Sequence, residues 1–232
     1  MADKKAKKTS LPVLLYLSLY NAVNIAGWAY VIYLLADHYA NDGTPDTLYG
    51  KVELPLKGVQ TLAAMEVLHA MVGLVRASPA TTALQVLSRL IVLWGVTHFA
   101  PAAQTGPCFT LMAASWSAVE VPRYLFLLLN LWNAVPYPLL WLRYSLFMVL
   151  YPTGISGEVW SIWSALPFIK ATGTLSVALP NAYNMLFDYH GFLWFTLLAI
   201  YPPGSVHMFG HMLRQRTKKL APPTADDAKK TQ

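Results

Sequence analysis

The sequence predicts an all-α protein, a polytopic membrane helix bundle with about six transmembrane helices. Of its 232 residues, 56% are hydrophobic and 12% are charged, whereas about a quarter of the residues of a soluble globular domain are charged. Basic residues flank the apolar runs at both ends of the chain: Lys4, Lys5, Lys7 and Lys8, then Arg214, Arg216, Lys218 and Lys219. The positive-inside rule therefore predicts two cytosolic termini, which requires an even number of crossings.

Seven apolar stretches are candidate spans, at roughly 11–36, 56–75, 84–101, 108–131, 133–151, 159–179 and 188–213. The first is too long for a signal-peptide core and no small-residue cleavage site follows it, so we expect an uncleaved span. Even parity favours six crossings. Either 159–179, which contains Pro167, Lys170 and Gly173, or 56–75, which contains Lys57, Glu66 and His69, is expected to be a partial or cavity-lining element. The weaker candidate for a crossing is 159–179.

A basic cytosolic tail at 1–10 and a polar tail at 214–232, expected to be disordered, flank one membrane domain at 11–213. The last four residues, KKTQ, match the dilysine signal that retrieves membrane proteins to the endoplasmic reticulum when the tail is cytosolic. The sequence thus predicts a multi-pass protein of that membrane. Its basic residues lie beside spans rather than on a soluble aromatic face, which does not suggest nucleic-acid binding.

Ionisable residues inside the apolar stretches are candidate functional residues, because each costs about 2.5–3.5 kcal/mol at the bilayer centre and is expected to face the bundle interior and pair. Glu66 and His69 are three residues apart, as are Glu120 and Arg123. Each pair reads either as a structural ion pair or as part of a site. Two further arginines, Arg89 and Arg143, either extend to the membrane interface or bind a phosphate or pantetheine group with a guanidinium.

The segment 141–158, WLRYSLFMVLYPTGISGE, ends an apolar run on Tyr151 and then supplies Glu158. On an unbroken helix these two residues would share a face but lie about 10 Å apart along the axis, too far to act on one bond. Between them stand Pro152, Gly154 and Gly157. These residue types predict a break that folds the chain back and brings the phenol and the carboxyl together at a membrane edge.

The string YPTGISGE at 151–158 resembles the YPxGxxxE core of the 3-hydroxyacyl-CoA dehydratases of very-long-chain fatty-acid elongation, once called protein-tyrosine-phosphatase-like proteins. Blocks in the same order as in that family extend the resemblance over about 11–213: Leu19-Tyr20-Asn21, Gly27-Trp28, 60–76, 85–89, Trp116, Glu120, Arg123-Tyr124, 141–144 and Leu179-Pro180-Asn181. Pro122 departs from the aliphatic residue usual before Arg-Tyr and predicts a kink in that helix.

The resemblance implies dehydration of a 3-hydroxyacyl thioester, with Tyr151 and Glu158 as catalytic residues. A desolvated carboxyl suits proton transfer and a neutral tyrosine can donate, so Glu158 is expected as the main acid/base and Tyr151 as a hydrogen-bond donor; exchanged roles remain open. Candidate substrate-binding residues are Arg89, Glu120, Arg123, Arg143 and Tyr144. No metal cluster, nucleotide loop or flavin motif is visible, so no cofactor is expected. The expected partners are acyl-CoA, membrane lipid and the condensing enzyme, ketoacyl-CoA reductase and enoyl-CoA reductase of the elongation cycle.

Three other functions compete with this one. A cysteine phosphatase needs an Arg six residues after its nucleophile, but Ala114 follows Cys108 at that offset, so Cys108 is expected to be a small apolar residue at the start of a span. An inactive membrane scaffold of the same family would not need the tyrosine and carboxyl at 151 and 158. A small transporter would use the buried charges as a path, but the chain shows no inverted repeat.

Overall fold

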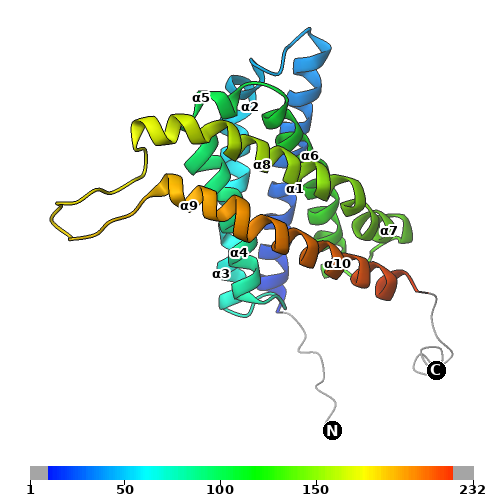
Figure 1. Ribbon diagram of the computed structural model, residues 1–232. Helices are drawn as coiled ribbons and strands as arrows, with labels where there is room; N and C mark the ends of the chain where they lie inside the picture. The colour runs from blue at the N-terminus through cyan, green and yellow to red at the C-terminus, as the bar shows by residue number, and fades with distance from the viewer. Residues whose placement is uncertain (1–9, 222–232) are drawn as a thin grey trace, which may run out of the picture.

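The computed structural model describes residues 10–221, which are almost entirely helical (Figure 1). The elements in chain order are α1 (Leu11–Ala40), α2 (Leu48–Leu62), α3 (Ala64–Met71), α4 (Pro79–Leu90), the π-helical turn η1 (Ile91–Thr97), α5 (Pro101–Gln104), α6 (Pro107–Leu131), α7 (Tyr137–Ser145), α8 (Phe147–Thr172), α9 (Tyr189–Phe195), the π-helical turn η2 (Thr196–Ile200) and α10 (Tyr201–Leu220). The predicted all-α class is confirmed.

Three of these helical segments are long and apolar enough to cross a membrane: Leu11–Ala40, Pro79–Thr97 and Tyr189–Leu220. The helices α6 and α8, with 25 and 26 residues, are each about 38 Å long at 1.5 Å per residue, which exceeds the roughly 30 Å of hydrocarbon in a bilayer. Within residues 10–221 the chain forms six long helical segments: α1, α2–α3, α4–η1, α6, α8 and α9–η2–α10. The protein is therefore a helical membrane bundle, and six crossings remain a prediction.

The expected division of 133–179 into two separate stretches is wrong. The first part forms only α7, which has 9 residues. The helix is then interrupted by a turn at Leu146. From Phe147 the helix α8 runs without a break through Pro152, Gly154, Gly157 and Pro167 to Thr172. A proline removes a single backbone hydrogen bond, and a packed membrane helix tolerates that loss because neighbouring elements and side chains satisfy the freed carbonyl.

The glycine at 157 lies at a close approach between two helices. A Cβ atom there would lie 2.6 Å from the backbone N of Met112 and 2.9 Å from the backbone O of Cys108, both on α6. Small residues allow helix backbones to come this close in membrane proteins. Gly157 therefore sets the packing of α8 on α6 and does not break the helix. Cys108 is buried near the start of α6, as the sequence predicts.

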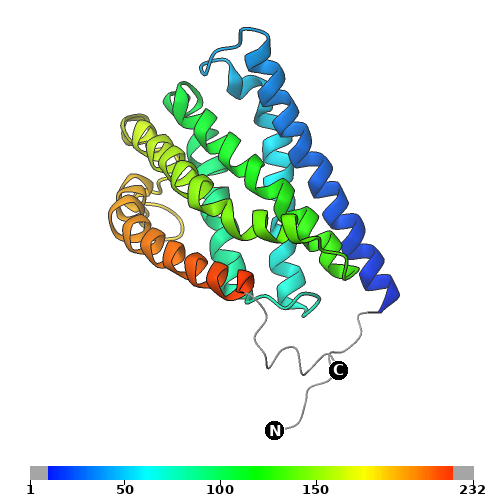
Figure 2. The ribbon, with the colours of Figure 1, turned by 90° about the vertical axis from the view of Figure 1, so that its right-hand side faces the viewer.

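Helix α6 is central to the bundle, because it packs against α1 on one side and α8 on the other. Among the largest fully buried side chains are three aromatic residues of α6, Phe109, Trp116 and Tyr124, together with Trp28 of α1. The assignment of α6 is continuous across Pro122. Figure 2 shows the beginning of α1 and the end of α10 toward the same end of the bundle, as an even number of crossings requires.

The helix α10 runs along α8 in the opposite direction, below it in Figure 1. Three contacts define this line, which we call the α8–α10 seam: Tyr201 with Glu158, Phe209 with Tyr151, and Arg216 with Ser145 at the end of α7. Residues 214–220, assigned to a tail from the sequence, continue α10. The basic residues 4–8 and the KKTQ end lie outside the described residues.

Candidate active site

Glu158 lies in the middle of the bundle, where α6, α8 and α10 meet. Its side chain is nearly buried, and each carboxyl oxygen accepts a hydrogen bond from a different helix. The indole Nε1 of Trp116 on α6 donates to Oε1 at 2.8 Å, and the hydroxyl of Tyr201 on α10 donates to Oε2 at 2.7 Å. Within residues 10–221, no Lys, Arg or His forms an ion pair with it. Two uncharged donors thus hold this carboxyl in place.

Sequence reasoning missed Tyr201 and Trp116 as partners of Glu158. Tyr201 follows η2, a five-residue π-helical turn, and precedes Pro202 and Pro203 at the start of α10. Such turns rotate the residues that follow and are frequent at functional sites. Tyr-Pro dipeptides occur at 137–138, 151–152 and 201–202, so this pattern alone does not single out Tyr201. The distance in sequence between 158 and 201 hid the contact.

Tyr151 lies two turns before Glu158 on the same helix and does not converge with it as expected. Because α8 is continuous, the two residues share a face but are separated by about 10 Å along the axis. The Tyr151 ring is half-buried and lies 6.3 Å from the ring of Phe209 on α10. Both residues therefore line the α8–α10 seam, and Tyr201, rather than Tyr151, contacts the carboxyl of Glu158.

A second polar cluster joins α3, α4 and α6, and we call it the charge network: Glu66, Arg89, Glu120, Arg123 and Tyr124. Glu120 accepts from Arg89 at 2.5 Å and also from the Nε of Arg123. Both terminal nitrogens of the Arg123 guanidinium donate hydrogen bonds to the carboxylate of Glu66, at 3.0 and 2.7 Å. Tyr124 donates to the same carboxylate at 2.5 Å. The ion pair expected between Glu120 and Arg123 is thus confirmed, within a larger set of contacts.

The other expected pair, Glu66 with His69, is wrong. The carboxylate of Glu66 is directed to Arg123, because a guanidinium offers two parallel donors where an imidazole offers one. His69 instead lies 2.8 Å from the hydroxyl of Tyr16, measured from its Nε2. Glu66 and His69 both lie on α3. Glu66 joins this helix to α6, and His69 joins it to α1.

Trp116 connects the charge network to Glu158. The guanidinium of Arg89 lies over its indole ring, 5.2 Å from the ring centre, while the indole N–H binds the carboxyl of Glu158. The charge network, through Arg89, thus adjoins the carboxyl site at Trp116. Arg143 and Tyr144 on α7 pack against Phe126 of α6: the guanidinium carbon of Arg143 lies 6.0 Å, and the ring centre of Tyr144 6.2 Å, from the centre of the Phe126 ring.

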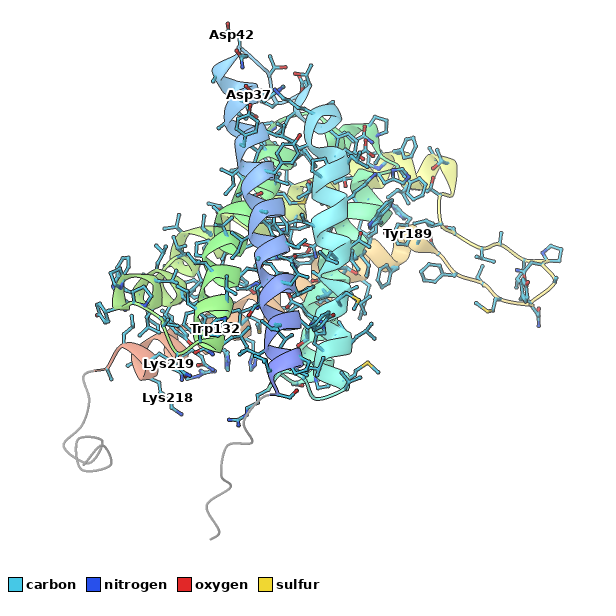
Figure 3. The ribbon with its side chains drawn as sticks, turned by 180° about the vertical axis from the view of Figure 1, so that it is seen from behind. Asp37, Asp42, Trp132, Tyr189, Lys218 and Lys219 are labelled. Carbon is cyan, nitrogen blue, oxygen red and sulfur yellow. The ribbon has the colours of Figure 1, made fainter. Side chains whose placement is uncertain are left out.

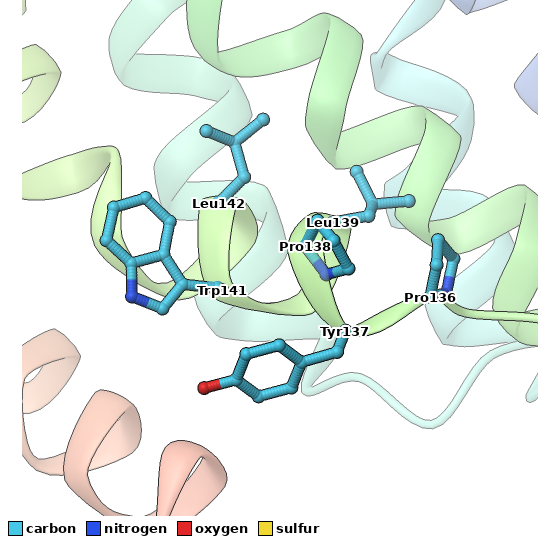
Figure 4. Close-up of a pocket in the computed structure, with 6 residues that line it drawn as sticks. All are labelled: Pro136, Tyr137, Pro138, Leu139, Trp141 and Leu142. Carbon is cyan, nitrogen blue, oxygen red and sulfur yellow. The ribbon is translucent and has the colours of Figure 1, made fainter.

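Two hollows open on the surface of the described residues. One is lined by Pro136, Tyr137, Pro138, Leu139, Trp141 and Leu142 of α7 (Figure 4). The other is an apolar groove between α2, α3 and α4 that includes Lys57 and Trp94. Neither is lined by Glu158 or Tyr151.

These features define a polytopic helical membrane protein with a buried carboxyl site between α6, α8 and α10. Residues 60–222 match the family described as "Protein tyrosine phosphatase-like protein, PTPLA", and the chain belongs to this family. It is 41% identical over 206 residues to "Very-long-chain (3R)-3-hydroxyacyl-CoA dehydratase 2" of Mus musculus, covering 89% of this chain and 81% of that protein. It is 44% identical over 208 residues to "Very-long-chain (3R)-3-hydroxyacyl-CoA dehydratase PASTICCINO 2B" of Oryza sativa subsp. japonica, covering 89% and 93%. No solved structure matches the chain.

Proposed function

We propose that this protein dehydrates long-chain 3-hydroxyacyl-CoA to trans-2-enoyl-CoA, the third step of very-long-chain fatty-acid elongation. The observation that carries the proposal is the environment of Glu158, a nearly buried carboxyl held by two uncharged donors. Neither oxygen of this carboxyl is committed to a cation, so we assign it the role of general acid/base. The names of relatives with 41% and 44% identity support the same reaction.

The elimination removes a proton from C2 of the acyl chain and the hydroxyl group from C3. In our proposal Glu158 accepts the C2 proton, the C2–H electron pair forms the new double bond, and the C3–O bond breaks. A tyrosine donates a proton to the departing hydroxyl, which leaves as water. Glu158 then returns its proton to that tyrosine, so the enzyme is restored and atoms and charge balance.

The contact of 2.7 Å between Tyr201 and Glu158 supports Tyr201 as this proton donor, since the return step needs a direct hydrogen bond between the two groups. Tyr151, on the same face of α8, remains a proposed hydrogen-bond donor to the substrate. Both roles need no cofactor. Two tyrosines thus divide the tasks that the sequence assigned to Tyr151 alone.

The charge network is assigned a supporting role. Glu120 is nearly buried between two guanidiniums, and Arg123 has two carboxylate partners, so both are committed to holding α3, α4 and α6 together. Arg89 acts on the site through Trp116 and is a positioning residue. Arg143 and Tyr144, near the end of the seam, remain proposed contacts of the CoA moiety.

The direct test is incubation of the purified protein in detergent with a long-chain (3R)-3-hydroxyacyl-CoA, with the trans-2-enoyl product measured by mass spectrometry. Product formation that Glu158→Gln abolishes supports the proposal. Absence of product from a folded wild-type protein contradicts it and favours an inactive scaffold or a transporter.

Location and partners are proposed on the same basis. The apolar helices make this a membrane protein, and the basic chain ends and KKTQ support the endoplasmic reticulum with both termini in the cytosol. The other enzymes of the elongation cycle are the proposed partners. Tags at the two termini should both be accessible when only the plasma membrane is permeabilised, and a protected tag would require an odd number of crossings.

A further inference from the structure

The α8–α10 seam leads from Glu158 to Ser145, the last residue of α7. Tyr201 contacts Glu158, the ring of Phe209 lies 6.3 Å from Tyr151 and 5.5 Å from Phe147, and the Nε of Arg216 donates to the hydroxyl of Ser145 at 3.1 Å. Figure 1 shows α10 following α8 toward α7. The seam therefore joins the carboxyl site to the same end of the molecule at which α10 ends.

One face of α7 continues from this point. Tyr137, Trp141 and Ser145 are spaced four residues apart, so they lie in one row on the helix. Tyr137 and Trp141 are 64% and 46% exposed and line the hollow of α7. In Figure 4 both aromatic side chains extend on the side of α7 that faces the nearby ribbon of α10. Two large flat surfaces are thus presented beside the last turns of α10.

Those last turns are basic. Arg216 is held by Ser145 in the same row as the two aromatic residues, and Lys218 and Lys219 follow at the end of α10, where Figure 3 labels them. The exposed aromatic rings of the hollow thus lie beside a cluster of cations at the end of α10. A ligand that matches both carries a planar ring and phosphate groups.

We propose that the α7 hollow binds the nucleotide end of acyl-CoA, with the adenine against Tyr137 and Trp141 and the phosphates at Arg216 and the lysines beside it. The inference rests on the proposed dehydratase function and names a binding site for the part of the substrate farthest from the reaction. An anionic lipid headgroup would share the phosphate chemistry but supplies no planar ring and has no reason to lie in line with Glu158.

Length supports this assignment. Ser145 precedes Glu158 by thirteen residues, which corresponds to about 20 Å along a helix. The pantetheine arm joins the thioester sulfur to the first phosphate through roughly a dozen bonds, which extend to about 15 Å at the reach of a peptide chain. The extended arm covers about three quarters of that distance, so a thioester at Glu158 directs its phosphates along the seam toward Arg216 and its adenine toward the α7 hollow, while the acyl chain continues in the opposite direction.

The test compares two substrates that differ only in the nucleotide: a long-chain 3-hydroxyacyl-CoA and the 3-hydroxyacyl-pantetheine with the same acyl chain. For the full-length wild type, kcat/KM should be higher with the CoA thioester. Trp141→Ala and Arg216→Gln should each reduce the ratio of the two kcat/KM values by about tenfold or more, which corresponds to the loss of one stacking or phosphate contact. Adenosine 3′,5′-bisphosphate should bind the wild type and bind both variants more weakly.

Two control variants match these changes. Trp160 on α8 is 46% exposed, like Trp141, and Arg214 is an exposed arginine two residues before Arg216, on another face of α10. Trp160→Ala and Arg214→Gln should leave the substrate ratio and the binding of the bisphosphate unchanged. The controls separate the proposed site from a general effect of losing a surface tryptophan or a positive charge.

An equal loss of activity on both thioesters would overturn the proposal, because it would indicate a structural role for α7. So would an unchanged ratio, or a variant effect that appears only when anionic lipid is added, which would assign the hollow to a headgroup. If the wild type dehydrates neither thioester, the proposed function fails. Equilibrium binding of adenosine 3′,5′-bisphosphate to wild type and variants then decides the site independently.

Discussion

Glu158 and Glu120 are both nearly buried glutamates in the same bundle, yet their surroundings are opposite. Glu120 lies between the guanidiniums of Arg89 and Arg123, whereas Glu158 accepts hydrogen bonds from a phenol and an indole. Both oxygens of Glu120 are committed to guanidiniums of neighbouring residues, whereas those of Glu158 meet only uncharged hydrogen-bond donors. The difference separates a group that stabilises the fold from one suited to chemistry.

The largest expected effect tests the reactive side of this comparison. Glu158→Gln keeps the size of the side chain and an oxygen that accepts hydrogen bonds, but it removes the group that takes up the proton. We expect dehydration to fall by about 10²- to 10⁴-fold, with little change in melting temperature. Turnover and thermal unfolding measured on the same preparation check this. A stable variant with normal turnover would show that Glu158 is not the acid/base.

The next effect tests the structural side. Glu120→Gln leaves Arg89 and Arg123 without a charged partner, and removing one member of a buried ion pair typically costs about 3–5 kcal/mol. We therefore expect a marked fall in melting temperature in detergent. A variant as stable as the wild type would mean that solvent screens the charge network, and Glu120 would no longer differ from Glu158 in the way described.

A double exchange sharpens the same point. If Glu120 and Arg123 formed an isolated pair, Glu120→Arg combined with Arg123→Glu would restore the stability lost in the single variants. The structure predicts no recovery, because the new arginine at 120 would face Arg89 and the new carboxylate at 123 would face Glu66. Melting temperatures of the two single variants and the double variant decide this, and full recovery would contradict the network.

These two regions also differ in how much of their structure could be predicted from the sequence. Composition and the apolar runs predict the helical membrane class. The i, i+3 spacing predicts the contact of Glu120 with Arg123, but it fails for Glu66 and His69, because Arg123 from another helix takes the carboxylate of Glu66. The partners Glu66, Arg89 and Tyr201 come from other helices, and no local spacing encodes those contacts. The resemblance singled out Glu158 without revealing what holds it.

The error at 152–157 has a related cause. Proline and glycine end helices when backbone groups can bond to water instead, and the sequence interpretation assumed that balance. In a packed membrane bundle, a broken helix would leave more backbone groups without partners than a continuous one. Gly157 is needed for the contact of α8 with the backbone of α6 at Cys108 and Met112, which could be recognised only once the neighbouring helix was known.

A smaller effect is expected from removing the phenol beside Glu158. Tyr201→Phe deletes the proposed proton donor together with its hydrogen bond to the carboxyl, so turnover should fall by about 100-fold, the lower end of the range for general acid catalysis. Tyr189→Phe is the matched control, because the Tyr189 hydroxyl is buried and has no hydrogen-bond partner in the described part of the chain. Equal turnover in the two variants would remove Tyr201 from the proposed proton path and return its role to Tyr151.

The smallest effect tests whether the two regions communicate. Trp116 binds Glu158 through its N–H and contacts Arg89 through its ring. Trp116→Phe keeps an aromatic face for Arg89 but removes the donor, and an indole N–H supplies no proton to the reaction. We therefore expect a loss of about 3- to 10-fold in turnover, equivalent to the roughly 1 kcal/mol of an ordinary hydrogen bond.

Combining Trp116→Phe with Arg89→Met gives a double-mutant cycle on turnover. If Arg89 acts on the site only through Trp116, its substitution should change turnover less in the Trp116→Phe background than in the wild type. Strictly additive losses would show that the charge network and the carboxyl site are neighbours in the bundle without influencing each other.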